Sequence, residues 1–182
     1  MVKMGKYEGL SKKSPKDAAK IVGDVDRLNY LAHSIREIEL AILQTQGRHY
    51  HIITYPLKNV KKSSILFFDH CCEIRLTYEY DKIDERIMRL ILAHEIGHLV
   101  YNIDKLRNPE LLKNVVPSIN EEIYAWLFAY YLIGEKSLEY ENNTQQKKFI
   151  YSPGELKNSI AAILRDEPEI SDAVIKSLPK SI

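Results

Sequence analysis

The sequence predicts an α+β domain in which a small antiparallel three-stranded sheet packs against helices. Three runs rich in β-branched and aromatic residues follow one another within residues 49–80. Segments whose apolar residues recur at helical spacing flank these runs on both sides. The chain has 182 residues, 45% of them hydrophobic, so it can bury one sizeable core. We therefore expect a single domain over residues 25–168.

The two ends of the chain are expected to lie outside this domain. Residues 1–24 hold many lysines and few large apolar side chains, which predicts a flexible Lys-rich arm. Near the other end, Ser152 can cap a helix over residues 155–167, and Pro168 is expected to stop it. Residues 169–182 then form a C-terminal tail.

The elements in between follow from local patterns. A first amphipathic helix is expected over residues 25–43, with Gly47 as its stop. Strands are expected over residues 49–55, 64–68 and 73–80. The strands should be antiparallel, because their connections are too short for helical crossovers. A helix capped by Asp81 should run to residue 101. Ser118 and Glu121 form a capping box that begins another helix, which Gly134 should end.

Charge and hydropathy exclude several classes of protein. With 26 Lys+Arg against 25 Asp+Glu, the net charge is +1, so we do not expect direct binding to nucleic acid. The longest apolar run, residues 123–133, is shorter than the about 18 residues that indicate a membrane span. No secretory signal is visible at the N-terminus, and the adjacent Cys71 and Cys72 make a poor disulfide framework. These observations predict a cytoplasmic protein.

Residues 94–98 read His-Glu-Ile-Gly-His, an HExxH motif. Residues four apart lie on one face of a helix, so His94 and His98 can bind one Zn²⁺ ion. Glu95 is offset by one residue and can act on a water rather than on the metal. The apolar stripe of the same helix, from Ile83 to Leu90, continues into the two histidines. Two unpaired inward imidazoles would be costly, and a metal ion satisfies both.

A catalytic zinc needs a third protein ligand. Tyr101 and Asp104 stand where the metzincin pattern requires Gly and His, which excludes that class. A Glu from a downstream helix is the remaining solution, and Glu121 and Glu122 are the candidates. The capping box gives Glu121 a structural role and so favours Glu122, although either residue can be a solvated surface carboxylate.

The chain resembles the ImmA/IrrE-type zinc metallopeptidases over about residues 25–135. In that family HExxH is paired with a helix of pattern Glu-x-x-Ala-[Asn/Asp]-x-Phe-Ala. Residues 122–129, EIYAWLFA, match its Glu, Ala, Phe and Ala. The resemblance assigns the third ligand to Glu122. Trp126 departs from the usual Asn or Asp, which removes an expected hydrogen-bonding partner of a ligand histidine. Gly134 and Glu135 stand where many members have Met-Pro.

The resemblance implies a zincin-like domain that hydrolyses a peptide bond through a zinc-activated water, with Glu95 as the catalytic base. It implies a protein or peptide substrate, with helix-turn-helix transcriptional repressors as one class, and an origin in bacteria or mobile elements. The competing hypothesis is a non-catalytic zinc-containing interaction or regulatory module. Cys71, Cys72 or His70 could fold over the metal and close its fourth position, either as a structural site or as a latency switch.

Two further features of the site stay open in the sequence. Tyr101, Tyr124 and His70 are candidate donors to the oxyanion, and spacing does not choose among them. The strand expected over residues 73–80 offers an edge that could hold an extended substrate by strand addition, or it is an ordinary half-buried strand.

Overall fold

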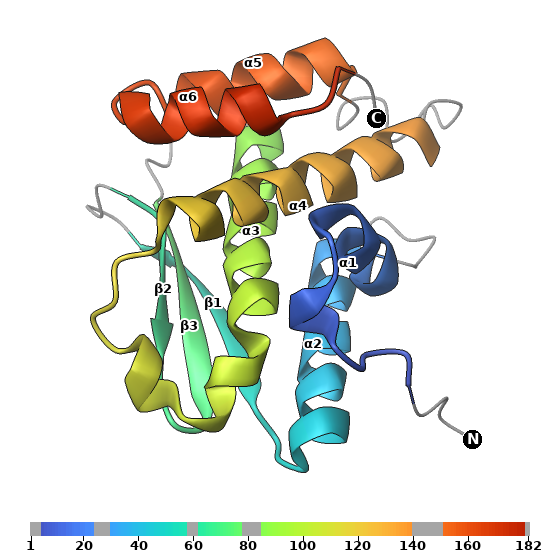
Figure 1. Ribbon diagram of the computed structural model, residues 1–182, viewed down its shortest axis with the longest axis vertical. Coiled ribbons are helices and arrows are strands. Elements are labelled where there is room, and N and C mark those ends of the chain that lie inside the picture. Colours follow the sequence, from blue (N-terminus) through green and yellow to red (C-terminus); the bar gives the residue numbers. More distant parts are fainter. Residues whose placement is uncertain (1–4, 24–29, 58–61, 78–84, 140–150, 181–182) are drawn as a thin grey trace.

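The computed structural model describes residues 5–23, 30–57, 62–77, 85–139 and 151–180. It is an α+β structure of helices around one small sheet (Figure 1). The α-helices are α1 (Pro15–Val22), α2 (Tyr30–Gln46), α3 (Glu85–Asn102), α4 (Ile119–Glu139), α5 (Pro153–Ile163) and α6 (Pro168–Ser177). The strands are β1 (His51–Leu57), β2 (Ser64–Phe67) and β3 (Cys71–Thr77), and short 3₁₀ turns η1 (Leu10–Lys12), η2 (Ile103–Arg107) and η3 (Pro109–Leu112) complete the list. The predicted cap Asp81 lies outside the described residues.

The sheet is mixed, so the prediction of a purely antiparallel sheet is wrong. Its strand order is β1-β3-β2; β3 pairs with β2 antiparallel and with β1 parallel. Parallel neighbours need a crossover of about a dozen residues, which is usually helical. Here β2 and its two connections provide that crossover, so no helix is needed. Because β3 is the central strand, the described part of the edge expected within residues 73–80 is already paired as far as Thr77, and residues 78–80 lie outside the described residues.

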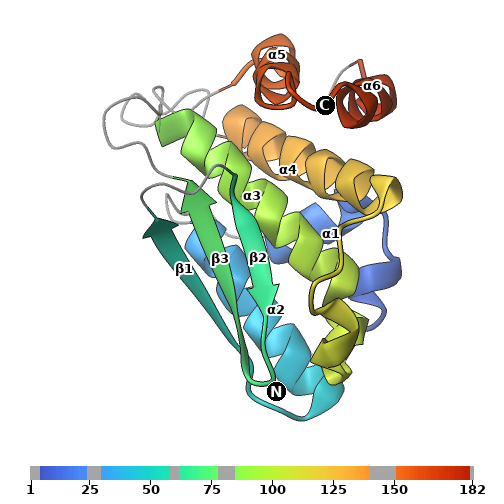
Figure 2. The same ribbon diagram turned by 90° about the vertical axis from the view of Figure 1, so that its left-hand side faces the viewer.

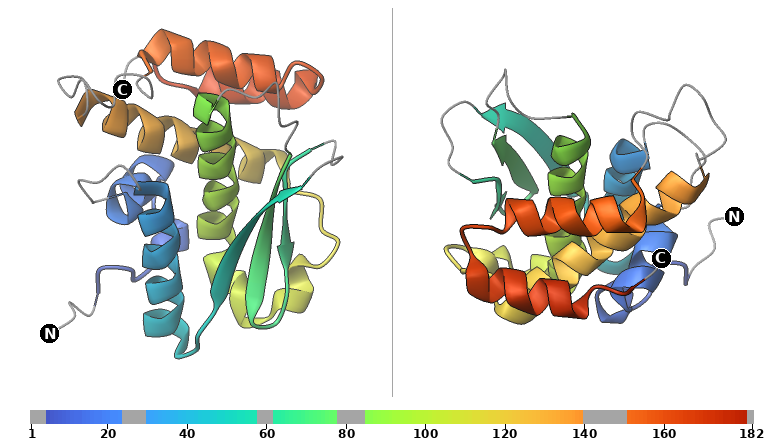
Figure 3. Two further views of the ribbon diagram at one scale, coloured as in Figure 1. Left: turned by 180° about the vertical axis from the view of Figure 1, so that it is seen from behind. Right: turned by 90° about the horizontal axis from the view of Figure 1, so that it is seen from above.

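Helix α3 lies at the centre of the molecule. The sheet covers one side of α3, and α2 packs on both α3 and β1 (Figure 2). Helix α4 crosses α3 and also contacts α1. The paired helices α5 and α6 lie on the far side of α4 (Figure 3). Leu90, Ile96 and Leu99 of α3 are completely buried, because neighbouring elements surround this helix. Among the described helices, none combines the length and the apolarity that crossing a bilayer requires.

The prediction of a flexible arm over residues 1–24 does not hold for residues 5–22. Helix α1 begins at Pro15, with Ser14 accepting a hydrogen bond from the amide of Asp17. Its Ala18 and Val22 are completely buried in contact with the rest of the core. Lys12, Lys16 and Lys20 are exposed to solvent, while small apolar residues of α1 are buried where this helix contacts α4.

A polar cluster around the buried carboxylate of Glu37 holds the start of the described chain against α2. Lys6 Nζ lies 2.6 Å from Glu37 Oε2, and the Tyr7 hydroxyl donates a hydrogen bond to the same carboxylate. His33 Nε2 lies 3.3 Å from the other oxygen of Glu37. Burial alone would raise the pKa of Glu37, but the hydrogen bonds from Lys6 and Tyr7 outweigh it and lower the pKa.

The C-terminal part corrects two helix boundaries. Gly134 does not end α4, which continues to Glu139. An interior glycine costs only about 1 kcal/mol, and burial of the apolar neighbours Leu132 and Ile133 offsets that cost. Pro168 does not precede a tail: α5 ends at Ile163, and Pro168 starts α6 in the first-turn position that suits proline. Val174 of α6 is completely buried, so residues 168–177 belong to the folded structure.

Candidate metal centre

The candidate site lies where α3 and α4 cross. His94 and His98 are on consecutive turns of α3, and Glu122 is in the first turn of α4. The helices approach so closely that a Cβ at Gly97 would lie 2.7 Å from Cα of Ala125. This contact requires glycine at residue 97, because the atoms that a Cβ would meet belong to the main chain of α4. The glycine inside the motif therefore brings Glu122 within reach of the histidines.

The structure brings the three predicted ligands together. The Nε2 atoms of His94 and His98 are 3.1 Å apart. Glu122 Oε2 lies 3.5 Å from His94 Nε2, and Glu122 Oε1 lies 3.7 Å from His98 Nε2. One ligand atom from each residue falls within a mutual distance of 4.8 Å, so the group can hold a metal ion. Two imidazoles and one carboxylate form a donor set that suits zinc and leaves its fourth position open.

Three polar side chains fix the orientation of His98. Its Nδ1 donates to Glu121 Oε1 at 2.9 Å, so Nε2 faces the site. The same Glu121 oxygen accepts a hydrogen bond from Asn102 Nδ2 at 2.7 Å, and Asn102 Oδ1 accepts one from Lys105 at 2.9 Å. Burial raises the pKa of Glu121, but the hydrogen bonds from His98 and Asn102 and the nearby positive charges together outweigh burial and lower the pKa. Burial lowers the pKa of His98, but the hydrogen bond with Glu121 and the neighbouring carboxylates together outweigh burial and raise the pKa. When His98 gives up its second proton to bind a metal ion, the remaining proton stays on Nδ1, as ligation through Nε2 requires.

The capping role predicted for Glu121 is only half correct. Its amide donates to Ser118 Oγ at 3.2 Å, as a helix cap requires. Its carboxylate, however, bonds to His98 and Asn102. Sequence reasoning missed Asn102 as well, although it lies four residues after His98 and so on the same face of α3. The structure gives the neighbouring glutamates different contacts: Glu122 approaches both Nε2 atoms, whereas Glu121 bonds to the far nitrogen of His98.

His94 has a different environment from His98. Its ring stacks on the indole of Trp126, with centroids 4.0 Å apart and planes at 24°. Its Nδ1 is buried and has no hydrogen-bond partner in the described part of the chain. Burial and the neighbouring His98 both lower the pKa of His94. The neutral imidazole that metal binding needs is therefore favoured.

Glu95 is the buried acid beside this group, with only 4% of its surface exposed. Burial raises its pKa to about 7, the charge of His98 opposes that shift, and the charge of Glu122 adds to it. Burial also raises the pKa of Glu122. A carboxyl group with a pKa near neutrality can both accept and release a proton at physiological pH.

Other residues considered in the sequence lie elsewhere. Neither cysteine nor His70 belongs to the metal-binding group found among the described residues. Cys72 is completely buried and both thiols are free; burial raises the pKa of Cys72. His70 lines a separate hollow with Cys71. The Tyr124 hydroxyl donates to the main-chain oxygen of Lys13 at 3.3 Å. Its proton is therefore directed away from the site.

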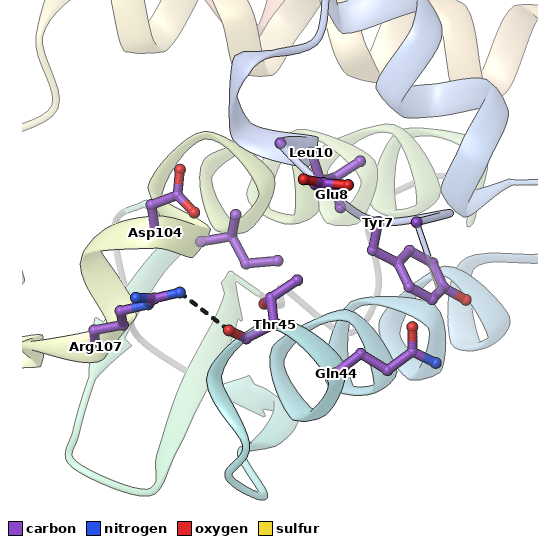
Figure 4. Close-up of a pocket in the computed structure, with 10 residues that line it drawn as sticks. Tyr7, Glu8, Leu10, Gln44, Thr45, Asp104 and Arg107 are labelled. Carbon is purple, nitrogen blue, oxygen red and sulfur yellow. Dashed lines mark hydrogen bonds between the residues drawn. The ribbon is translucent and has the colours of Figure 1, made fainter. Parts of the chain in front are cut away.

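A separate cavity of about 440 Å³ lies between the N-terminal segment, α2 and η2 (Figure 4). Arg107 donates to the main-chain oxygen of Thr45 at 3.0 Å. Asp104 accepts a hydrogen bond from Ser11, and the hydroxyl of Tyr7 bonds to Glu37. These three polar groups of the lining already have partners, and the metal-binding group found among the described residues includes no residue of this cavity.

Comparisons with known proteins add no assignment: no family model, curated protein or solved structure matches this chain.

Proposed function

We propose that this protein is a zinc-dependent metallopeptidase that hydrolyses a peptide bond in a specific regulatory protein, such as a transcriptional repressor. The convergence of His94, His98 and Glu122 on one point carries the proposal. It is supported by the burial of Glu95 next to that point and by the hydrogen bonds that present Nε2 of His98.

The residues present fit zinc. The donor set of two histidines and one glutamate is that of known catalytic zinc sites, and the contact between His98 and Glu121 is typical of an oriented ligand histidine. His94, His98 and Glu122 would hold the ion. When bound, zinc supplies Lewis acidity, which lowers the pKa of a water molecule and polarises the scissile carbonyl.

Glu95 is assigned the proton transfers. With its pKa raised to about 7, its carboxylate can take a proton from the attacking water and its acid form can return that proton to the leaving amine. Glu121 and Asn102 keep His98 in place during these steps. Burial of Glu95 and the histidines excludes bulk water and strengthens each of these interactions.

A peptide chain as substrate is supported by the surface next to the site. Val115 and Val116 are exposed in the segment that leads into α4, and Ile119 is exposed in its first turn. Glu122 follows less than one helical turn later. Exposed apolar side chains grouped beside a site are typical of contact with another polypeptide. Helix-turn-helix repressors enter this proposal through the family resemblance alone.

The alternative, a non-catalytic zinc-containing module, draws support from the burial of the histidines, which leaves 7% of His94 and 3% of His98 exposed. A structural zinc is normally closed by a fourth protein ligand. Within the part of the chain that the structure describes, the group has three members. An open position and a proton-accepting Glu95 favour the enzyme.

The experiment measures metal content and cleavage in the same set of proteins. Wild type, Glu95→Gln and Glu122→Gln are purified without added metal and their zinc is counted by mass spectrometry. We expect about one zinc in wild type and in Glu95→Gln, and loss of zinc in Glu122→Gln. Each protein is then incubated with a complex peptide library, and new termini are sequenced.

Cleavage by wild type that is absent in zinc-loaded Glu95→Gln supports the peptidase. Equal cleavage by the two proteins would refute the role of Glu95. Zinc binding without cleavage of any peptide or candidate repressor would favour the non-catalytic module. Absence of zinc from wild type, even after reconstitution, would refute both the zinc metallopeptidase and the zinc-containing module.

A further inference from the structure

Trp126, the single tryptophan of the chain, lies against the candidate metal centre. It is one turn beyond Glu122 on α4 and is 3% exposed. Its indole faces the imidazole of His94 almost in parallel, at 24° and 4.0 Å between centroids. The ring of His98 meets His94 nearly at right angles, with centroids 4.6 Å apart. Two rings therefore restrict how His94 can tilt.

The hydrogen bond that usually orients a ligand histidine is missing at His94. A metal-binding imidazole almost always donates its other N–H to a carboxylate, a carbonyl or water. His98 does so through Glu121, at 2.9 Å. The Nδ1 of His94 is buried with no partner among the described residues. In the structure, His94 Nε2 contacts His98 Nε2 at 3.1 Å, but that contact is given up when both nitrogens bind a metal ion. Among the described residues, no hydrogen bond is then left to fix the plane of the His94 ring.

Filling this position with an indole costs free energy. Its Nε1 is also buried without a hydrogen-bond partner in the described structure. Leaving a buried donor unsatisfied is costly, and leucine or phenylalanine would fill the position without that cost. A role in packing alone would therefore favour an apolar side chain, whereas a flat aromatic face against His94 gives the residue a specific use.

We propose that Trp126 is a positioning residue for the metal centre, which holds the imidazole plane of His94 by stacking in place of a hydrogen bond at Nδ1. This inference rests on the proposed function, since it assigns a role around the same ligand. Trp126 touches neither the metal nor the substrate in this scheme. It acts only through His94, by keeping Nε2 directed at the point where His98 and Glu122 converge.

The test compares the zinc affinity of four proteins by competition with a chromophoric chelator. Trp126→Phe keeps an aromatic face, and Trp126→Leu fills the space without one. Phe128→Leu is the matched control, because Phe128 is a completely buried aromatic two residues away on the same helix. Loss of an outer partner of a ligand typically costs about 10–100-fold in metal affinity, and we expect that loss in Trp126→Leu. Trp126→Phe and Phe128→Leu should stay close to wild type.

A second measurement is independent of zinc and of any variant. In metal-free wild type, the ring protons of His94 should show an upfield ring-current shift by NMR, while those of His98 should not show the same shift. Wild-type His94 protons at unshifted positions would overturn the proposal. So would Trp126→Leu binding zinc as tightly as wild type, or an equal loss of affinity in Phe128→Leu. Failure of wild type to bind zinc would overturn the metal centre together with this inference, whereas the other results leave the metal centre standing.

Discussion

The close approach of α3 and α4 makes Gly97→Ala the most direct test of the fold around the site. A methyl group at residue 97 would meet main-chain atoms of Ala125: Cα at 2.7 Å, O at 2.9 Å and C at 3.2 Å. Ordinary contacts of a Cβ lie at 3.4–4 Å. Main-chain atoms of a helix cannot rotate away as a side chain can, so α4 would have to move by about 1 Å.

Two effects of opposite sign decide the magnitude. Replacing an interior helical glycine by alanine contributes about 1 kcal/mol of helix propensity. Overpacking a core typically costs about 1–3 kcal/mol, and a clash with main chain lies at the upper end. We therefore expect a net loss of about 2 kcal/mol in the free energy of unfolding, which for a domain of this size lowers the Tm by roughly 4–8 °C. The shift of α4 also moves Glu122, so zinc affinity should fall as well.

The assay is urea unfolding of the metal-free protein, which separates packing from metal binding. Gly154→Ala is the control, because a Cβ at Gly154, in the first turn of α5, meets nothing within 4 Å. That variant should be neutral or stabilised by up to about 1 kcal/mol. The reasoning is refuted if Gly97→Ala is as stable as wild type or is stabilised as Gly154→Ala is.

Three other perturbations test separate parts of the structure. Glu121→Gln removes the negative charge beside Nδ1 of His98, so zinc affinity in chelator competition should fall about tenfold; an unchanged affinity would mean that the carboxylate does not support the ligand. Glu37 has a lowered pKa in the folded protein, so its contribution to stability is present above about pH 4.3 and is lost as the pH falls through the lowered value. Glu37→Gln should therefore lose less unfolding free energy than wild type between pH 5 and pH 3, and parallel curves would contradict this sign. Leu10→Ala should lower the free energy of unfolding by about 2–5 kcal/mol in chemical denaturation, because Leu10 is 1% exposed. An unchanged free energy of unfolding would support the original prediction of a peripheral arm.

Local patterns were sufficient for the centre of the site. A spacing of four residues puts His94 and His98 on one helix face whatever surrounds the helix, and α3 carries both in the structure. The capping position of Ser118 likewise follows from adjacent residues, and its oxygen accepts from the amide of Glu121. Local patterns favoured Glu122 as the third ligand, and the family's Glu-x-x-Ala pattern assigned it. The structure places Glu122 within reach of both histidines.

Longer-range features were not predictable in the same way. The role of Glu121 depends on where α4 crosses α3, because its carboxylate can reach either its own cap or His98. The parallel pairing of β1 with β3 depends on which strand takes the central place, and short connections do not decide that. The burial of α1 was also not predictable, because its sequence mixes charged residues with only a few small apolar ones.

By itself, the sequence determined the α+β class, the helix that bears the two histidines and the chemistry of their donor set, because these depend on residue type and on spacing within one element. Only the tertiary structure decided the strand order, the separate roles of Glu121 and Glu122, and the stacking of Trp126 on His94. These depend on contacts between elements far apart in the chain, whose distances are set by packing. At this site the two helices come close enough at Gly97 and Ala125 that a Cβ on residue 97 would meet the main chain of α4.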